Sequence, residues 1–352
     1  MSSMPLSLRC GAAALALAGL LTLAQAAPGL PSTNVAWLAA AVDADIDKAF
    51  AQARAEKKPV LLYWGASWCP PCNQLKATLF NRQDFATQSR SFVAVHVDGD
   101  RPGAQKLSRR FKVSGYPTVL LMSADGSEIT RLPGEADAEQ VMAVLQLGMA
   151  GGRPVAAVLA DARAGKPLNA GEWRLLAFYS WATDDQRLLP RADQPALLAQ
   201  LAVASGRPGS AADAPTTTRL WLKALAASTD GQGVKADAAL RARVLAVLAD
   251  AAQARAQMDV LTGDAPAIMR ALSDDGAAER APLQAAFEQA LQRLQADATL
   301  SRGDRFGALV ARIELARLGQ AKDEVRPRLP EALLKDVREQ AARADREISD
   351  AY

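Results

Sequence analysis

The sequence is poor in metal-binding side chains and carries little excess charge. It has three cysteines and one histidine, His96, among 352 residues. One of the cysteines, Cys10, lies in an N-terminal segment that is predicted to be removed, so that Cys69, Cys72 and His96 remain. A structural zinc site needs four such ligands, so cysteine and histidine alone cannot build one here, although two thiolates could still bind copper(I). The net charge of +3 is spread along the chain, which argues against a dedicated nucleic-acid or membrane surface.

The N-terminus has the pattern of a cleaved export signal. A polar stretch ends at Arg9, an apolar run covers residues 11–23, and Ala24-Gln25-Ala26 has the A-x-A form that signal peptidases cut. The run is shorter than the roughly 17 to 25 residues of a spanning helix, which favours cleavage over a membrane anchor. We predict a signal peptide over 1–26 and a periplasmic mature chain without stable membrane insertion. Export also removes Cys10, and the remaining close pair is then free for chemistry.

The first part of the mature chain alternates strand-like and helix-like segments. Helical spacing predicts a helix from about Asp43 to Lys58, and Pro59 precedes an apolar run over 60–64 that is typical of a strand buried on both faces. Further strands are expected over 92–97, 118–122 and 127–132, and helices over 72–80, 102–111 and 135–147. This order predicts an α/β fold with a mixed central sheet and helices on both faces.

The character of the chain changes after residue 147. Glycines and a proline make 148–154 a linker-like segment. Beyond it, apolar residues recur at helical spacing and strand-like runs are almost absent. We predict an α/β domain over 27–147, a linker over 148–154 and an all-helical domain over 155–352, to which the sequence assigns no role.

Cys69 and Cys72 lie where a predicted strand passes into a helix. Two thiols separated by two residues can close a disulfide, and the unpaired N–H groups of a helix N-terminus stabilise a thiolate at the first of them. This geometry predicts Cys69 as an exposed nucleophile, and Cys72, one turn deeper, as the residue that resolves the mixed disulfide. Pro71 fits the first turn because that position needs no N–H. No cofactor beyond this redox-active disulfide is expected.

Two motifs resemble the thioredoxin superfamily: Trp68-Cys69-Pro70-Pro71-Cys72 after one apolar strand, and Tyr116-Pro117-Thr118 before another. The resemblance covers about 43–147. It implies a thioredoxin-like fold with a helical extension, and thiol:disulfide oxidoreductase activity. The segment 58–63, which precedes the cysteine motif, resembles the corresponding segment of exported thioredoxin-like proteins and of the soluble C-terminal domain of the transmembrane thiol:disulfide interchange reductase.

The same resemblance implies a substrate-binding surface around the cysteines. In the family, the proline matching Pro117 has a cis peptide bond and lies against the pair, and the backbone before it, at Tyr116, pairs with an extended substrate. Trp68, next to the nucleophile, is expected on the rim that substrates touch, together with Pro70 and Pro71. Gly134 matches a loop that substrate backbone approaches, although a plain turn explains it equally well.

Tyr63 departs from the family pattern. Typical thioredoxins carry a buried aspartate at this position before the first cysteine. A phenol has a pKa of about 10 and is a poor base at neutral pH, so water or another acid must take the proton from Cys72. His96, in the middle of a predicted strand, is expected to be a hydrogen-bonded structural residue and not a catalytic base.

These features predict a reductase of protein or peptide disulfides outside the cytoplasm. Because the mature chain has no predicted membrane segment to bring in electrons, a membrane reductase is expected as its donor. A disulfide oxidase or isomerase using the same pair is one alternative, which the reduction potential distinguishes. A binding or scaffold protein whose helical domain recruits a partner is the other.

Overall fold

The structure is a computed structural model that describes residues 34–133, 138–184, 188–228, 233–274, 276–318 and 329–350. The predicted signal peptide and Gly134 lie outside these ranges.

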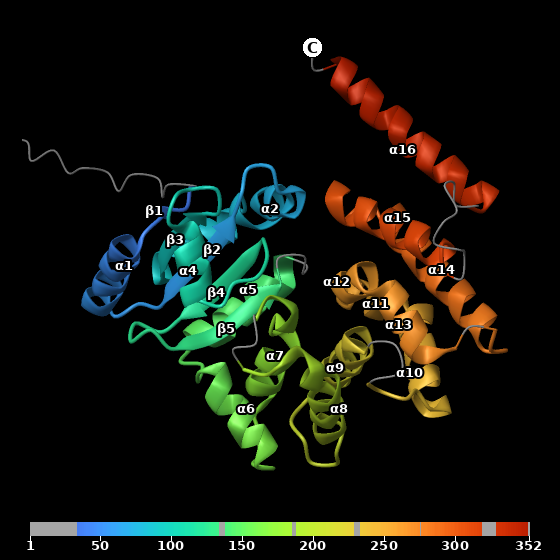
Figure 1. Ribbon diagram of the computed structural model, residues 1–352, viewed down its shortest axis with the longest axis horizontal. Coiled ribbons are helices and arrows are strands. Elements are labelled where there is room, and N and C mark those ends of the chain that lie inside the picture. Colours follow the sequence, from blue (N-terminus) through green and yellow to red (C-terminus); the bar gives the residue numbers. More distant parts are fainter. Residues whose placement is uncertain are drawn as a thin grey trace, which may run out of the picture. The chain divides into compact units, whose positions relative to one another are not determined.

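Residues 38–133 build a five-stranded mixed sheet (Figure 1). Its strands are β1 (Leu38–Ala40), β2 (Val60–Gly65), β3 (Val93–Asp98), β4 (Thr118–Met122) and β5 (Glu128–Pro133), in the order β1-β3-β2-β4-β5. β1, β3 and β2 run parallel, whereas β4 is antiparallel to both β2 and β5. Every residue of β2 and β4 is buried, as expected for strands covered on both faces.

Alternation along β2 divides the core into two layers. Leu62 and Trp64 pack with α1 (Asp43–Glu56) and α4 (Ala104–Arg110) on one face. Leu61 and Tyr63 point to the other face. There they meet α2 (Pro70–Leu75) with its π-helical continuation Lys76–Phe80, α3 (Gln83–Gln88) and α5 (Ala138–Met149). The predicted mixed sheet with helices on both faces is confirmed.

The chain continues as helices after Pro154, which confirms the prediction of a helical second part. These helices are α6 (Val155–Arg163), α7 (Ala170–Phe178), α8 (Gln194–Ser205), α9 (Ala214–Ala227), α10 (Ala238–Ala249), α11 (Ala251–Ala256), α12 (Met258–Gly263), α13 (Ala265–Leu272), α14 (Arg280–Ala296), α15 (Arg302–Ala316) and α16 (Glu331–Asp350). Four of these helices are capped by a side chain that accepts a hydrogen bond from the backbone N–H three residues further on. The caps are Asp213 for α9, Asp237 for α10, Asp250 for α11 and Ser301 for α15.

One apolar cluster crosses the predicted linker. It joins Leu61 and Val144, on the sheet side, with Trp173, Leu198 and Leu220 from the helices that follow. α5 itself extends to Met149, inside the segment 148–154. The helices as far as α9 therefore complete the covering of one face of the sheet, while a second cluster within residues 222–315 holds the later helices together. The division into domains at 148–154 stays a prediction.

Buried polar contacts at β5 also connect the sheet with the helices that follow it. Arg131 is fully buried and donates to both carboxylate oxygens of Glu128, at 3.1 and 3.2 Å. It also donates to the backbone carbonyl oxygens of residues 111 and 112, at 2.7 and 2.6 Å. From beyond the linker, the Tyr179 hydroxyl donates to Glu128 at 3.2 Å, and the Ser180 N–H donates to the Arg131 carbonyl at 2.8 Å. The cluster ties β5, the loop after α4 and the segment after α7 together.

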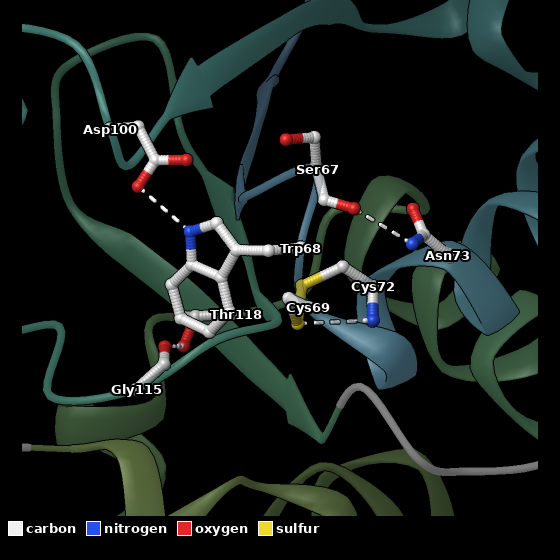
Figure 2. Close-up of a disulfide and its surroundings, with 8 residues drawn as sticks. All are labelled: Ser67, Trp68, Cys69, Cys72, Asn73, Asp100, Gly115 and Thr118. Carbon is white, nitrogen blue, oxygen red and sulfur yellow. Dashed lines mark hydrogen bonds between the residues drawn. A yellow bond between two sulfur atoms is a disulfide. The ribbon is translucent and has the colours of Figure 1, made fainter.

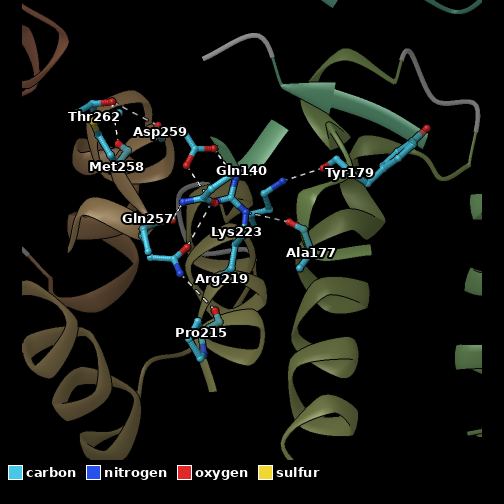
Figure 3. Close-up of polar contacts among 11 residues, drawn as sticks. Gln140, Ala177, Tyr179, Pro215, Arg219, Lys223, Gln257, Met258, Asp259 and Thr262 are labelled. Atoms are coloured by element: carbon cyan, nitrogen blue, oxygen red, sulfur yellow. Dashed lines mark hydrogen bonds and ion pairs between the residues drawn. The ribbon is translucent and has the colours of Figure 1, made fainter. Parts of the chain in front are cut away.

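A second buried ion pair connects the helices with one another (Figure 3). Arg219 on α9 pairs with Asp259 on α12, with Nη1 2.8 Å from Oδ1, and its guanidinium lies 4.0 Å from the ring centroid of Phe178. One turn further along α9, Lys223 donates to the carbonyl oxygen of Tyr179 at 2.7 Å. Any movement of α9 that separated Arg219 from Asp259 would leave an uncompensated buried charge. The ion pair therefore holds α9 in place against its neighbours.

Candidate active site

Cys69 and Cys72 form a disulfide at the N-terminus of α2 (Figure 2). β2 ends at Gly65 and α2 begins five residues later, at Pro70. Cys69 is the residue that caps α2, and its sulfur accepts a hydrogen bond from the backbone N–H of Cys72 at 3.2 Å. Pro70 and Pro71 occupy the first helical positions, where no N–H is needed. The helix N-terminus therefore points at the Cys69 sulfur, an arrangement that stabilises a thiolate.

The disulfide is more deeply buried than the sequence predicts. Cys69 has an exposed fraction of 3% and Cys72 of 0%, so the expectation of an exposed Cys69 is wrong. The reason is a small buried cluster that Ala66 forms with the two cysteines and against which Tyr116 packs. This covering limits the directions from which a substrate sulfur can approach Cys69.

Trp68 directly precedes the pair and is exposed, as expected of a rim residue, and its contact with substrates stays a prediction. Its side chain is 67% exposed, and its indole N–H donates to the Asp100 carboxylate at 2.9 Å (Figure 2). Asp100 was not predicted from the sequence to be part of the site. The signal that could have found it is the parallel pairing of β2 with β3, in which Gly65 is the register partner of Asp98. Parallel neighbours end at the same edge of a sheet, so the residues that follow them meet there.

The loop before β4 forms the opposite side of the site. The Tyr116–Pro117 peptide bond is cis, which confirms that prediction for Pro117. The Tyr116 ring lies directly against Gly99, because a Cβ placed on Gly99 would be 2.4 Å from ring atoms. Tyr116 also packs against the small cluster of Ala66 and the two cysteines, so the structure brings Tyr116 and the disulfide together. The expected place of Pro117 against the pair, and the pairing of the preceding backbone with a substrate, stay predictions.

An aromatic pair joins the neighbouring strands β2 and β3. Tyr63, 1% exposed, stacks on His96 with ring centroids 5.0 Å apart and an interplanar angle of 16°. Within the described residues, neither the Tyr63 hydroxyl nor His96 Nε2 has a hydrogen-bond partner, so the expectation of a hydrogen-bonded His96 is wrong for this nitrogen. Burial raises the pKa of Tyr63 to about 12 and lowers that of His96. Both side chains are therefore neutral at pH 7.

Neither a metal centre nor a membrane span is formed by the part of the chain that the structure describes. No three histidine, cysteine, aspartate or glutamate side chains gather there as ligands for a metal ion. No helix there combines the length and apolar character needed to cross a bilayer. That the cysteine pair works without a metal or other cofactor stays a prediction.

A comparison with known families identifies the part of the chain that contains the cysteine pair. The family model described as a thioredoxin-like domain matches residues 46–148, a region that holds the cysteine pair, the cis-proline and strands β2 to β5. Residues 46–148 are a thioredoxin-like domain.

Similar proteins match somewhat less than a third of the chain. The thiol:disulfide interchange protein DsbD 2 of Pseudomonas aeruginosa is 32% identical over 111 residues, which are 30% of this chain and 19% of that protein. The thiol:disulfide interchange protein DsbD of Yersinia pestis is 33% identical over 98 residues, which are 27% and 16% of the two chains. This chain thus spans less than a fifth of the length of either relative.

Solved structures similar to the chain include two from bacteria. The oxidised C-terminal domain of DsbD from Neisseria meningitidis is 25% identical, and the match covers 32% of this chain and 97% of that chain with a TM-score of 0.28. A thioredoxin from Thermus thermophilus is 26% identical, with a match over 31% of this chain, 83% of that chain and a TM-score of 0.28.

Proposed function

We propose that this protein is a thiol:disulfide oxidoreductase that exchanges disulfides with protein or peptide substrates through Cys69 and Cys72. The observation that carries the proposal is the Cys69–Cys72 disulfide at a helix N-terminus, with a backbone N–H on the Cys69 sulfur and Tyr116 of the cis-proline loop packed against it. The names of the similar proteins, which describe thiol:disulfide interchange, support it.

The exchange would take place in two steps that balance in sulfur and in electrons. In the reducing direction, the Cys69 thiolate attacks one sulfur of a substrate disulfide, forms a mixed disulfide and releases the other substrate sulfur as a thiolate. Cys72 then attacks the Cys69 sulfur, which releases the second substrate thiolate and restores the Cys69–Cys72 disulfide. The substrate gains two electrons and the cysteine pair loses two.

We propose reduction as the direction of this exchange and the periplasm as its compartment. The export pattern over 1–26 supports the compartment. Each turnover consumes two electrons, so a reductase in the membrane is proposed as the donor that regenerates the two thiols.

The reduction potential of the pair tests both the activity and its direction. We expect the Cys69/Cys72 couple of the full chain to have a potential near or below about −230 mV, in the range of reducing proteins. It can be measured by equilibrating the protein in defined thiol/disulfide buffers and counting free thiols by alkylation. A value near about −120 mV would indicate an oxidase, and a pair that does not exchange at all would contradict the proposal.

Loss of the exposed indole is expected to weaken protein binding without affecting the chemistry. In a Trp68→Ala variant, KM for a protein disulfide should rise about tenfold, because a large aromatic side chain at an interface often contributes more than 1 kcal/mol. The rate with a small-molecule disulfide should stay unchanged. Asp100→Asn keeps the indole and serves as the matched control with a smaller effect. An unchanged KM in Trp68→Ala would remove this residue from the substrate surface.

A further inference from the structure

The loop before β4, residues 111–117, brings Tyr116 to the cluster of Ala66 and the two cysteines. Within this loop Lys112 has a φ of 53°, a left-handed conformation that is uncommon for residues other than glycine. At the end of the loop, the Thr118 hydroxyl donates to the Gly115 carbonyl oxygen at 2.7 Å (Figure 2). The first half of the loop is held by contacts from other parts of the chain, and these contacts decide where Tyr116 lies.

Arg131 on β5 holds the start of this loop. Its guanidinium donates to the carbonyl oxygens of Phe111 and Lys112, at 2.7 and 2.6 Å. Arg131 is held in turn from beyond residue 154, because its own carbonyl oxygen accepts the Ser180 N–H at 2.8 Å. The loop is thus linked, through β5, to the segment that follows α7.

The same segment, residues 179–184, also contacts the loop directly and is called the bridging segment below. Val113 and Asp184 form an antiparallel β-bridge, and the Ser114 hydroxyl lies 3.5 Å from the Ala182 carbonyl oxygen. Val113 and Ser114 precede Tyr116 by three and two residues. The bridging segment lies outside the matched thioredoxin-like domain, which ends at residue 148. A part of the chain beyond that domain therefore reaches the loop that carries Tyr116.

The bridging segment is itself anchored among the helices. Asp184 is fully buried, and its Oδ2 accepts a backbone N–H four residues further on, at 3.0 Å. The carbonyl oxygen of Trp181 accepts from Gln194 Nε2 at 3.2 Å, and that of Ala182 accepts from Arg191 Nη2 at 3.1 Å. A segment fixed by these bonds provides a firm support for the loop before β4.

We propose that the bridging segment positions Tyr116 against the cysteine pair and thereby selects which disulfides reach Cys69. This inference rests on the proposed function and gives a segment beyond the thioredoxin-like domain a part in substrate selection. With the loop held, the surface that Tyr116 forms is in place before a peptide disulfide binds, so binding avoids the cost of ordering it. The same surface leaves Cys69, 3% exposed, poorly accessible to small thiol reagents. Asp184 is a positioning residue in this proposal, since it acts through the loop.

Loosening the bridging segment should have opposite effects on peptides and on small reagents. In Asp184→Ala, KM for a peptide disulfide should rise about fivefold with kcat unchanged, because the loop then has to be ordered on binding. Alkylation of Cys69 by iodoacetamide in the reduced full chain should become about fivefold faster, because the loop opens more often. The pH midpoint of this alkylation, which reports the thiolate, should not move. Cys72 should stay unreactive, whereas general unfolding would expose both thiols.

Three further variants make the result specific. Asp184→Asn keeps an oxygen for the backbone N–H that Asp184 accepts and should behave like the native chain. Asp237→Ala removes a comparable aspartate cap, at the start of α10, and should change neither KM nor the alkylation rate. Arg191→Ala removes an exposed side chain from the Ala182 carbonyl oxygen. It should shift both values in the same direction as Asp184→Ala, by about twofold.

Native values of KM and of the alkylation rate in Asp184→Ala would overturn the inference, and so would equal shifts in Asp237→Ala. If Asp184→Ala does not fold, Arg191→Ala decides, and native values in that variant overturn the inference. Failure of the proposed function would look different. The native chain would then exchange no disulfide with the peptide, while alkylation of Cys69 could still be compared among the variants.

Discussion

Replacement of Cys72 by alanine is expected to leave substrates covalently attached to Cys69. The variant keeps the attacking sulfur at the N-terminus of α2 but lacks the buried sulfur that would otherwise cleave the mixed disulfide. Incubation with a model peptide disulfide should give a nearly stoichiometric adduct, whereas the native chain should accumulate almost none. Intact mass before and after treatment with a reductant measures the adduct directly.

Cys69→Ala is the matched control for this experiment. It retains one thiol of the same pair, but Cys72 is fully buried and should form little or no adduct. Equal adducts in the two variants would show that the order of attack is wrong. If neither variant forms an adduct and the protein still binds partners, the alternative of a binding protein acting through its helices gains support.

Replacement of Arg131 by alanine is expected to lower the free energy of unfolding by about 3–5 kcal/mol. The Glu128 carboxylate, with a side chain 2% exposed, would lose its buried counter-charge. The carbonyl oxygens of residues 111 and 112 would lose their donor at the same time. Denaturant titration of the full chain, followed by circular dichroism, measures the loss.

Arg110→Ala provides the comparison for that value. Arg110 is exposed and pairs with Asp43 at 2.8 Å and with Asp47 at 3.4 Å, so its removal should cost about 1 kcal/mol or less. Similar losses in the two arginine variants would mean that the cluster around Arg131 contributes no more than a surface ion pair.

The central strands could be predicted because burial on both faces leaves a continuous apolar run. β2 covers 60–65, against a prediction of 60–64, and β4 coincides with the predicted 118–122. β1 could not be predicted, because it has three residues of which only Ala40 is buried, and so short a segment shows no alternation. It exists because it pairs with β3, a tertiary contact that no local pattern records.

The site was predictable where chemistry depends on spacing along the chain. The two-residue separation of Cys69 and Cys72 and the motif at Pro117 are local signals. The covering of Cys69 by Tyr116, in contrast, depends on a loop 47 positions later folding back. The stacking of His96 on Tyr63 depends on the register between two strands, which is why a strand histidine was interpreted as an ordinary structural residue.

The apolar cluster shared between the sheet and the helices changes how genetic experiments on this protein should be designed. A truncation before α6 would expose the side of the sheet that Trp173, Leu198 and Leu220 help to cover, and would remove Tyr179 from the buried Glu128 carboxylate. The loss of phenotype in such a strain would reflect degradation of a misfolded chain. Substitutions at exposed helical positions such as Val203 and Phe306, 49% and 53% exposed, leave the fold intact and isolate what the helices contribute in the cell.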